Sequence, residues 1–316
     1  MLSPDTIHIV SCTDKNYLQH LGVLITSLFE NKTCENNLVY HIFHTDLEEA
    51  DQQLLKESVR KYKTILEFHN VGTFHCYDSI IRYGHVSKTA LYRLSIGDIL
   101  PVTIEKVLYL DCDIIINGDI LELWNTRLEN HQVAAVEDAP VFTRHEHLLM
   151  PKESRYFNSG VLLINLVKWR SNNTSLKVID FLIKYPERRL YNDQDGLNSI
   201  LYNDWFRLPP VFNQQTALFY LPLKRLVYTK DEYLLARKHP VIIHYTGVVI
   251  NTKPWHYIDS HPFKYLYYRY LRLTPWSGFH APSRGLKDVI RKYYLIAVRI
   301  KMKSGIVFSK ILRTKK

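Results

Sequence analysis

Apolar residues along the chain recur with two different periods, and the two alternate in the way that strands alternate with helices. Residues 6–11 have the composition of a strand, and the next segment carries apolar residues at helical spacing: Tyr17, Leu18, Leu21, Leu24, Ile25 and Leu28. Further strands are predicted at 39–44, 64–71, 133–138, 156–165 and 240–245, and further helices at 48–61, 87–100, 176–185 and from 191 onward. This order of elements predicts an α/β fold.

One apolar stretch is interrupted by two acids. Residues 106–118 read K-V-L-Y-L-D-C-D-I-I-I-N-G, and the length and the β-branched residues predict a buried parallel strand rather than a helix. Asp111 and Asp113 interrupt it, and two carboxylates at the end of a buried strand cost free energy unless a positive charge neutralises them. We therefore expect a bound divalent cation at this point.

Other polar residues lie at the predicted ends of strands and helices, and each also has a purely structural interpretation. Asp14 and Asn16 follow the first strand, where one of them is equally expected to cap a helix. Arg93 is either a surface or ion-pair residue, or a group that reaches a phosphate or orients the acids. His244 ends a late strand, where a histidine is usually a core residue, but near two unpaired carboxylates it becomes a candidate third metal ligand.

Two segments are predicted as loops, a polar one and an apolar one. Residues 140–155 contain His145 and His147, and without a further Cys or His arrangement a mobile loop is favoured over a zinc site. Residues 209–223 are predicted to be an apolar loop, and the aromatic run from Phe263 to Tyr270 suits either a membrane face or an acceptor cleft.

Composition limits the classes of protein that this chain represents. The 316 residues are 46% hydrophobic and 23% charged, which predicts a substantial core and excludes wholesale disorder. The four cysteines are far apart in sequence, which favours reduced thiols of a cytosolic protein (Cys12, Cys34, Cys76 and Cys112). We recognise no signal peptide at the N-terminus and no apolar run of spanning length.

The net charge of +10 comes from the C-terminal segment. Residues 284–316 contain 11 Lys or Arg and one acid, which leaves 30 basic and 30 acidic residues in 1–283. From Leu286 to Met302, apolar residues recur at helical spacing between basic ones, and a second apolar and basic piece runs from Ile306 to Lys316. This pattern favours a helix in the interface of an anionic membrane, with a helix folded back on the catalytic domain as the alternative. It does not favour nucleic-acid binding, because no basic groove is predicted elsewhere.

Six blocks of sequence, taken together, resemble one enzyme family. They are C-T-D-K-N-Y, L-Y-R-L, V-L-Y-L-D-C-D, Y-F-N-S-G-V-L-L-I-N-L, N-D-Q-D-G-L-N and H-Y-T-G…K-P-W-H, and they occur in order between residues 7 and 256. The chain in this respect resembles family 8 of the retaining glycosyltransferases, which contains glycogenin and the bacterial lipopolysaccharide galactosyl- and glucosyltransferases. The resemblance implies a GT-A fold, with a Rossmann-like mixed sheet flanked by helices that binds a nucleotide sugar.

The resemblance also implies roles for particular residues. The donor would be UDP-galactose or UDP-glucose, and the cofactor Mn²⁺, with Mg²⁺ as a second option. Three residues resemble the metal ligands (Asp111, Asp113 and His244), and eight others resemble contacts of the nucleotide, sugar or diphosphate (Asp14, Asn16, Arg93, Asn158, Asp193, Gln194, Gly247 and Lys253). One departure concerns the last two, because Lys253 follows Gly247 by six residues where the family usually has three.

These inferences combine into one functional hypothesis. Residues 1–260 are expected to form a metal-dependent catalytic domain that transfers galactose or glucose to a lipid-linked bacterial surface glycan, and 261–316 a membrane-associating segment. Gln194 and Asp193 are the candidate catalytic residues, and because Gln194 is a poor nucleophile we favour front-face attack by the acceptor hydroxyl. The enzyme is expected in the cytoplasm, attached to the inner face of the membrane. The alternatives are a sugar-phosphate nucleotidyltransferase, although residues 12–17 lack its Gly-rich phosphate loop, and a non-catalytic UDP-sugar-binding protein.

Overall fold

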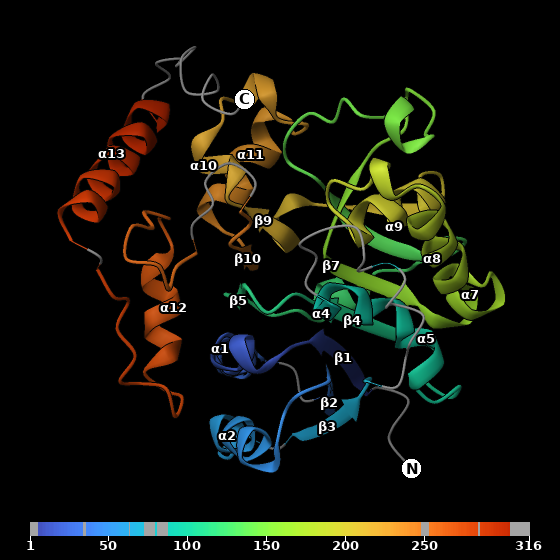
Figure 1. Cartoon of the computed structure of the whole chain (residues 1–316), viewed down its shortest axis with the longest axis horizontal. Coiled ribbons are helices and arrows are strands. Elements are labelled where there is room, and N and C mark those ends of the chain that lie inside the picture. The colour runs from blue at the N-terminus through green and yellow to red at the C-terminus, as the bar shows by residue number, and fades with distance from the viewer. Residues whose placement is uncertain are drawn as a thin grey trace.

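The computed structural model describes residues 6–33, 36–62, 64–72, 80, 88–247, 253–283 and 285–303. Its main feature is a seven-stranded sheet with the strand order β3-β2-β1-β4-β7-β6-β8 (Figure 1). Strand β7 runs antiparallel to both of its neighbours, whereas the other pairs are parallel. The strands are β1 Ile7–Cys12, β2 Leu38–His44, β3 Ile65–Asn70, β4 Lys106–Leu110, β6 Val133–Glu137, β7 Phe157–Asn165 and β8 Trp205–Leu208.

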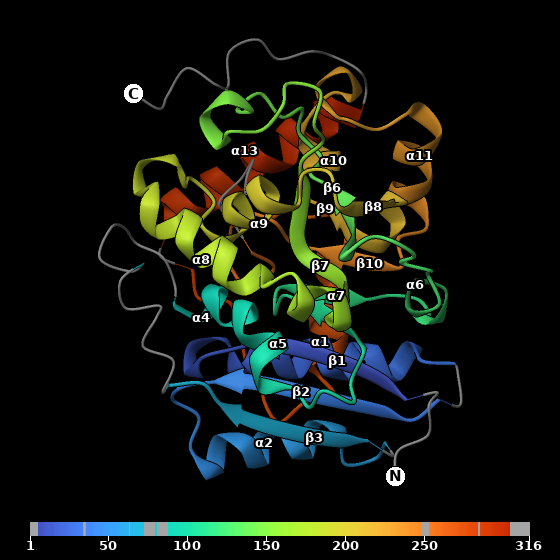
Figure 2. The same ribbon diagram turned by 90° about the vertical axis from the view of Figure 1, so that its right-hand side faces the viewer.

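Helices cover both faces of this sheet because successive strand residues point to opposite sides. Ile9 packs with Leu24 in the core under helices α1 (Leu18–Asn31) and α2 (Glu49–Val59). Its neighbour Val10 packs with Leu182 in the core on the other face. That face is covered by α7 (Leu166–Ser171), α8 (Thr174–Lys184) and α9 (Asp193–Leu201), as Figures 1 and 2 show. The predicted α/β class with a mixed, flanked sheet is confirmed.

The stretch from Lys106 to Gly118 does not form the single strand that its composition predicted. After β4 the chain turns at Asp111–Asp113 and enters a second sheet of strand order β5-β10-β9. Its strands are β5 Ile114–Ile116, β9 Gln214–Gln215 and β10 Ile242–His244. An apolar run shows that residues are buried but does not show that the chain changes sheets within it, so the two aspartates lie between two strands.

Two other segments also differ from the prediction. The helix expected at 87–100 is divided into α4 (Lys88–Leu91), a 3₁₀ turn η3 (Tyr92–Ser95) and α5 (Ile96–Ile99), and residue 87 lies outside the described residues. Residues 209–223 contain short buried elements instead of an open loop: η6 (Pro210–Asn213), β9 and α10 (Ala217–Tyr220). Burial of Phe212, Leu218 and Phe219 fixes this segment against the core.

The C-terminal part packs on the rest of the protein. Helix α12 (Lys264–Leu271) lies against α1, where the Tyr267 hydroxyl is 2.7 Å from His20 Nδ1 and Asn31 Nδ2 donates to the Tyr270 hydroxyl at 2.7 Å. The aromatic run therefore fills an interface within the protein. Helix α13 (Leu286–Lys303) forms where the sequence predicted it and lies beside α10 (Figure 1), whereas the piece from Ile306 to Lys316 is outside the described residues.

The remaining elements connect this framework. They are η1 (Lys15–Tyr17), α6 (Leu121–Trp124), η4 (Glu146–Leu148), η5 (Pro186–Arg188), η7 (Leu223–Arg225) and α11 (Lys230–Lys238). Cys12 and Cys112 are buried free thiols, as predicted, and the other two cysteines lie outside the described residues. Within the described ranges, no helix is both long and apolar enough to cross a membrane.

Candidate active site

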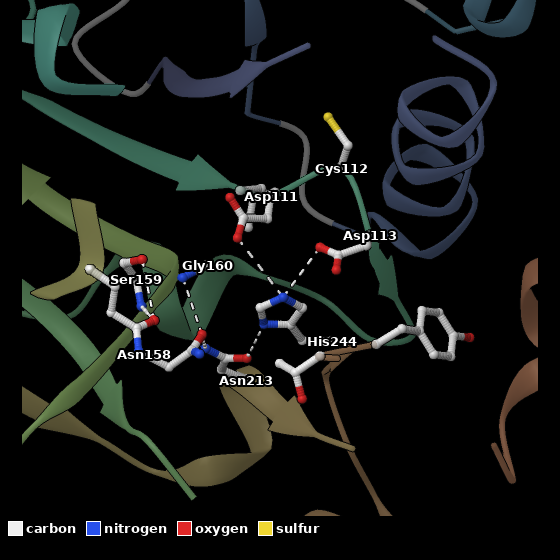
Figure 3. Close-up of polar contacts among 12 residues, drawn as sticks. Asp111, Cys112, Asp113, Asn158, Ser159, Gly160, Asn213 and His244 are labelled. Carbon is white, nitrogen blue, oxygen red and sulfur yellow. Dashed lines mark hydrogen bonds and ion pairs between the residues drawn. The ribbon is translucent and has the colours of Figure 1, made fainter. Parts of the chain in front are cut away.

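The crossing between the two sheets places two carboxylates beside His244. Strand β10 runs antiparallel to β5 with His244 opposite Ile114, the residue that follows Asp113. His244 Nε2 lies 3.2 Å from Asp113 Oδ1 and 3.9 Å from Asp111 Oδ2 (Figure 3). The three residues each offer one atom in a group whose members lie within 4.8 Å of one another. The sequence-predicted ligand set is therefore brought together in space.

A chain of hydrogen bonds sets the tautomer of His244. Asn158 Oδ1 accepts from the Gly160 backbone N–H at 3.1 Å, and Asn213 Nδ2 donates to the same oxygen at 2.9 Å (Figure 3). The Asn213 amide oxygen is thereby directed to His244 Nδ1, 3.0 Å away. Because an amide oxygen only accepts, the proton lies on Nδ1 and the Nε2 lone pair faces the carboxylates. This is the state in which an imidazole binds a metal ion.

Gly160 leaves the space that the side chains of Asp111 and His244 occupy. A Cβ atom at this position would lie 2.8 Å from Asp111 Oδ2 and would overlap the His244 ring. Any larger residue in this part of β7 would displace at least one of the two side chains, because atoms at such a distance repel one another. At Gly160 the strand thus presents only backbone to the site.

Arg93 is buried and bridges two acids. Its Nη2 donates to Asp111 Oδ1 at 2.9 Å, its Nη1 donates to the Ser159 carbonyl at 2.6 Å, and its Nε lies 2.9 Å from Asp193 Oδ2. The Nε–H itself is directed to the Ala90 carbonyl, so the contact with Asp193 is an ion pair rather than a hydrogen bond. Burial opposes the charge of Arg93, yet the two carboxylates raise its pKa. Arg93 therefore orients the acids, one of the interpretations that its sequence position left open.

A lysine ammonium already lies against the carboxylate pair. Lys253 Nζ donates to Asp113 Oδ2 and, at 2.6 Å, to the Tyr245 carbonyl. Burial alone would raise the pKa of Asp113, but the Lys253 ammonium holds it well below its usual range. Although the intervening residues 248–252 lie outside the described part of the chain, the longer connection after the half-buried Gly247 does bring Lys253 to the site.

A cavity extends from the aspartates to the turn after the first strand. Its volume is about 220 Å³, and it is lined by residues from both ends, including Asp14, Tyr17, Thr89, Arg93, Asp111 and Asp113. It lies beyond the carboxyl ends of β1 and β4, where the strand order changes direction, and this is where open α/β sheets bind ligands. Asp14 caps η1 by accepting from the Asn16 and Tyr17 backbone N–H groups at 2.9 and 3.1 Å. The capping interpretation of Asp14 is correct, and it leaves the exposed Asn16 side chain beside the cavity mouth.

Gln194 is fixed at both ends of its amide. Its Oε1 accepts from the Ser159 backbone N–H at 3.0 Å, and its Nε2 donates to Asp138 Oδ2 at 3.1 Å and to the Tyr156 hydroxyl at 3.2 Å. Burial raises the pKa of Asp138 to about 6 and that of Asp193, despite Arg93, also to about 6. The wall of the site beyond the ligands thus contains two buried carboxyl groups and an immobilised amide.

Comparison with known proteins identifies the family to which this arrangement belongs. Residues 8–259 match the family described as glycosyl transferase family 8. The chain belongs to this family. As a member of it, the protein is a hexosyltransferase, and the family resemblance seen in the sequence is confirmed.

Two relatives and one solved structure show how closely the family 8 enzyme resembles other members. General stress protein A of Bacillus subtilis (strain 168) is 33% identical over 90% of this chain and 99% of its own. The lipopolysaccharide 1,3-galactosyltransferase of Salmonella typhimurium (strain LT2) is 30% identical over 86% of this chain and 80% of its own. A crystal structure of the galactosyltransferase LgtC in complex with donor and acceptor sugar analogs has a TM-score of 0.74 at 24% identity, and covers 85% of this chain and 96% of that one. This structural likeness confirms the GT-A fold.

Sequence reasoning missed three residues that shape the site of this family 8 enzyme: Asp138, Asn213 and Gly160. Asp138 carried a usable signal, because it ends an apolar strand in the same way as Asp111 does. Asn213 carried none, since it lies in a segment without hydrophobic periodicity. His145, in the segment predicted as a loop, contacts its own loop instead: its Nε2 lies 2.8 Å from the Ser154 carbonyl.

Proposed function

We propose that the enzyme is a metal-dependent, retaining galactosyl- or glucosyltransferase that uses a UDP-sugar. One observation carries the proposal: Asp111, Asp113 and His244 converge at one end of a cavity whose other end is the Asp14 turn. A nucleoside diphosphate sugar needs this combination, because its base and ribose bind at a polar turn and its diphosphate at a cationic centre. The names of two lipopolysaccharide hexosyltransferases among the relatives support galactose or glucose as the transferred sugar.

The residues at the cationic centre fit a divalent ion. Two carboxylates and an imidazole with a free Nε2 lone pair are ligands that suit Mn²⁺, and Mg²⁺ would use the same carboxylate oxygens. The Lys253 ammonium, held against Asp113, shows that the site stabilises positive charge in the way such an ion requires. When bound, the ion would neutralise charge on the departing diphosphate.

The chain's own residues then position the sugar. Lys253 would turn from Asp113 toward the diphosphate and add a second positive charge there, and Gly247 would allow its backbone to approach closely. Asn158 lies on β7, and Asp193 and Gln194 begin α9; these residues would bind sugar hydroxyls and hold the anomeric carbon toward the acceptor. The Gln194 amide is held by Ser159, Asp138 and Tyr156, so it is a fixed dipole rather than a nucleophile. We therefore favour front-face attack by the acceptor hydroxyl, with retention of configuration.

The acceptor is proposed to be a saccharide hydroxyl of a lipid-linked bacterial surface glycan of the lipopolysaccharide type. Helix α13 supports a membrane location, because four of its apolar residues occupy one narrow arc at helical spacing and are exposed: Leu286 at 73%, Ile290 at 62%, Tyr293 at 67% and Ile300 at 58%. The opposite side of α13 packs inward, where Val298 contacts Phe219 and Tyr220 of α10. The helix thus folds back on the core and still presents an apolar, basic surface. On this basis α13, rather than the whole of residues 261–316, would bind the cytoplasmic face of an anionic membrane.

The donor and the metal are tested together. Release of UDP from UDP-galactose and UDP-glucose is measured with Mn²⁺, with Mg²⁺ and after treatment with EDTA, and the anomeric configuration of the product is read by NMR. We expect turnover with one or both donors only when a divalent ion is present, and loss of it in Asp113→Asn. The absence of hydrolysis and transfer with every UDP-sugar, or full activity in EDTA, would refute the proposal.

The membrane contact is tested separately with vesicles. Wild-type protein should sediment with phosphatidylglycerol vesicles and not with phosphatidylcholine vesicles, and I290N/Y293N should remain in the supernatant. The matched control is L176N, which changes another exposed apolar residue, 60% exposed on α8. Equal sedimentation of I290N/Y293N and wild type would remove α13 from membrane binding, and UDP release shows that the variant is still folded.

A further inference from the structure

Three neighbouring strands carry a cluster of histidines outside the cavity described above. His41 on β2 lies directly opposite Glu67 on β3, and His69 is two residues further along β3, so all three side chains lie on the same face of the sheet. His8 on β1 joins them, because it is two residues from Val10, the partner of His41. Figure 2 shows β1, β2 and β3 side by side at one end of the sheet.

The spacing of three atoms in this cluster matches a metal coordination shell. His41 Nδ1 lies 3.1 Å from Glu67 Oε2 and 3.1 Å from His69 Nε2, and the last two atoms are 3.8 Å apart. A triangle with these edges has a point about 2.0 Å from each corner, and zinc bonds to nitrogen and carboxylate oxygen measure about 2.0–2.2 Å. The spacing of the three atoms is therefore that of the ligands of a single ion.

We propose that His41, Glu67 and His69 form a second metal site, which binds Zn²⁺ or a similar borderline divalent ion. Two imidazoles and one carboxylate are the ligand set that such ions accept, with the remaining position open to water. The site is open to solvent on the side of His69 and Glu67, whose side chains are 21% and 44% exposed. The His41 side chain, by contrast, is buried. The ion would tie the edge strand β3, none of whose residues is fully buried, to β2.

A fourth residue, His8, contacts the other nitrogen of the His41 ring. His41 Nε2 lies 3.0 Å from His8 Nδ1. If His41 donates its proton to His8, its Nδ1 is free to face Glu67 and His69, which gives His8 the role of orienting a ligand. A ladder of hydrogen-bonded imidazoles without an ion has the same nitrogen spacing, so binding must be measured.

The experiment separates this site from the catalytic one. Full-length D111N/D113N protein, stripped with chelator and checked by circular dichroism, is titrated with Zn²⁺ in a calorimeter and with Co²⁺ by visible absorption. We expect one equivalent to bind, with a rise in the unfolding temperature. In the D111N/D113N background, a further E67Q or H69Q substitution should weaken the affinity for Zn²⁺ at least tenfold and remove the rise in unfolding temperature. In the same background, H8Q should weaken the affinity for Zn²⁺ by about 10- to 100-fold. The matched control is H131Q, a histidine 3.9 Å from Asp204 on another part of the surface.

The outcomes do not overlap with those for the catalytic reaction. Zn²⁺ binding that is equal in the D111N/D113N background and in its E67Q/H69Q derivative would overturn the proposal. Failure of the background protein to bind Zn²⁺ or Co²⁺ at 100-fold excess would overturn it as well. A loss of stability in H69Q that is the same with and without Zn²⁺ would show a hydrogen-bonded ladder only. None of these readings depends on turnover or on a nucleotide sugar.

Discussion

Gly160→Ala is the substitution that most directly tests whether Asp111 and His244 act together. The added Cβ would lie 2.8 Å from Asp111 Oδ2, whereas ordinary contact begins at 3.4 Å, and it would overlap the His244 ring as well. The oxygen must therefore move by about 0.6 Å, which exceeds the tolerance of roughly 0.2 Å for metal–ligand distances. Two of the three ligands are displaced by a single methyl group.

The expected result is a selective loss of metal-dependent activity. The Mn²⁺ concentration for half-maximal UDP release should rise at least tenfold, while the overpacked strand loses about 1–3 kcal/mol of stability in urea unfolding with EDTA present. The matched control is Gly118→Ala, whose Cβ would meet Val241 Cγ1 at an ordinary 3.5 Å and should change neither quantity. Unchanged Mn²⁺ dependence in Gly160→Ala, in a protein that unfolds like the wild type, would refute the assignment of these ligands.

Three further substitutions test the residues around the ligands. Arg93→Met leaves the buried carboxylate of Asp193 and the partly buried one of Asp111 without their shared partner. It should cost about 3–5 kcal/mol in urea unfolding, so a loss below 1 kcal/mol would show that the carboxylates are neutralised otherwise. Asn213→Ala frees the His244 ring and should raise the Mn²⁺ requirement about 10- to 100-fold, whereas an unchanged requirement would separate the tautomer from metal binding. Asp138→Asn tests a pH dependence: burial raises the pKa of Asp138 to about 6, so its contribution to folding is full at pH values below about 4 and declines by about 3 kcal/mol as the pH rises from about 4 through 6. The stability of Asp138→Asn relative to wild type should therefore improve from pH 4 to pH 8, and a constant difference would contradict the assigned shift.

The alternation of strands and helices was predictable, and the places where elements break were not. The spacing of hydrophobic residues indicates which residues are buried, but not which sheet they belong to. From Lys106 to Gly118 the apolar run continues, although the chain leaves one sheet and joins another. The helix at 88–99 contains a 3₁₀ turn in which both Tyr92 and Arg93 are buried between Leu91 and Leu94. A continuous amphipathic helix does not bury four consecutive residues, because one side of it faces solvent. A reader of the sequence pattern therefore expects Arg93 on the exposed side and does not predict its burial.

The site was predictable where a charged residue interrupts an apolar element, and not where a neutral one supports it. Asp111, Asp113 and His244 conflict with their surroundings in sequence, which marks them as candidates without any structure. Asn213 and Gly160 do not conflict with anything, because an amide in an irregular segment and a glycine in a strand each have many structural uses. Their contribution is positional, and it depends on contacts with residues more than 30 and 80 positions away, such as His244.

The meeting of the three proposed ligands depends on the register between two very short strands. Strands β5 and β10 have three residues each, and a slip of one residue would turn His244 to the opposite face, away from Asp113. The register is held at both ends by bonds outside the strands, from the Tyr245 N–H to the Asp113 carbonyl at 3.0 Å and from the Asn117 N–H to the Val241 carbonyl at 2.7 Å. The first of these bonds comes from the residue that follows His244 and ends on the backbone of Asp113. Asp113 and His244 are thus linked through the main chain, so folding sets their relative positions before any ion or nucleotide binds.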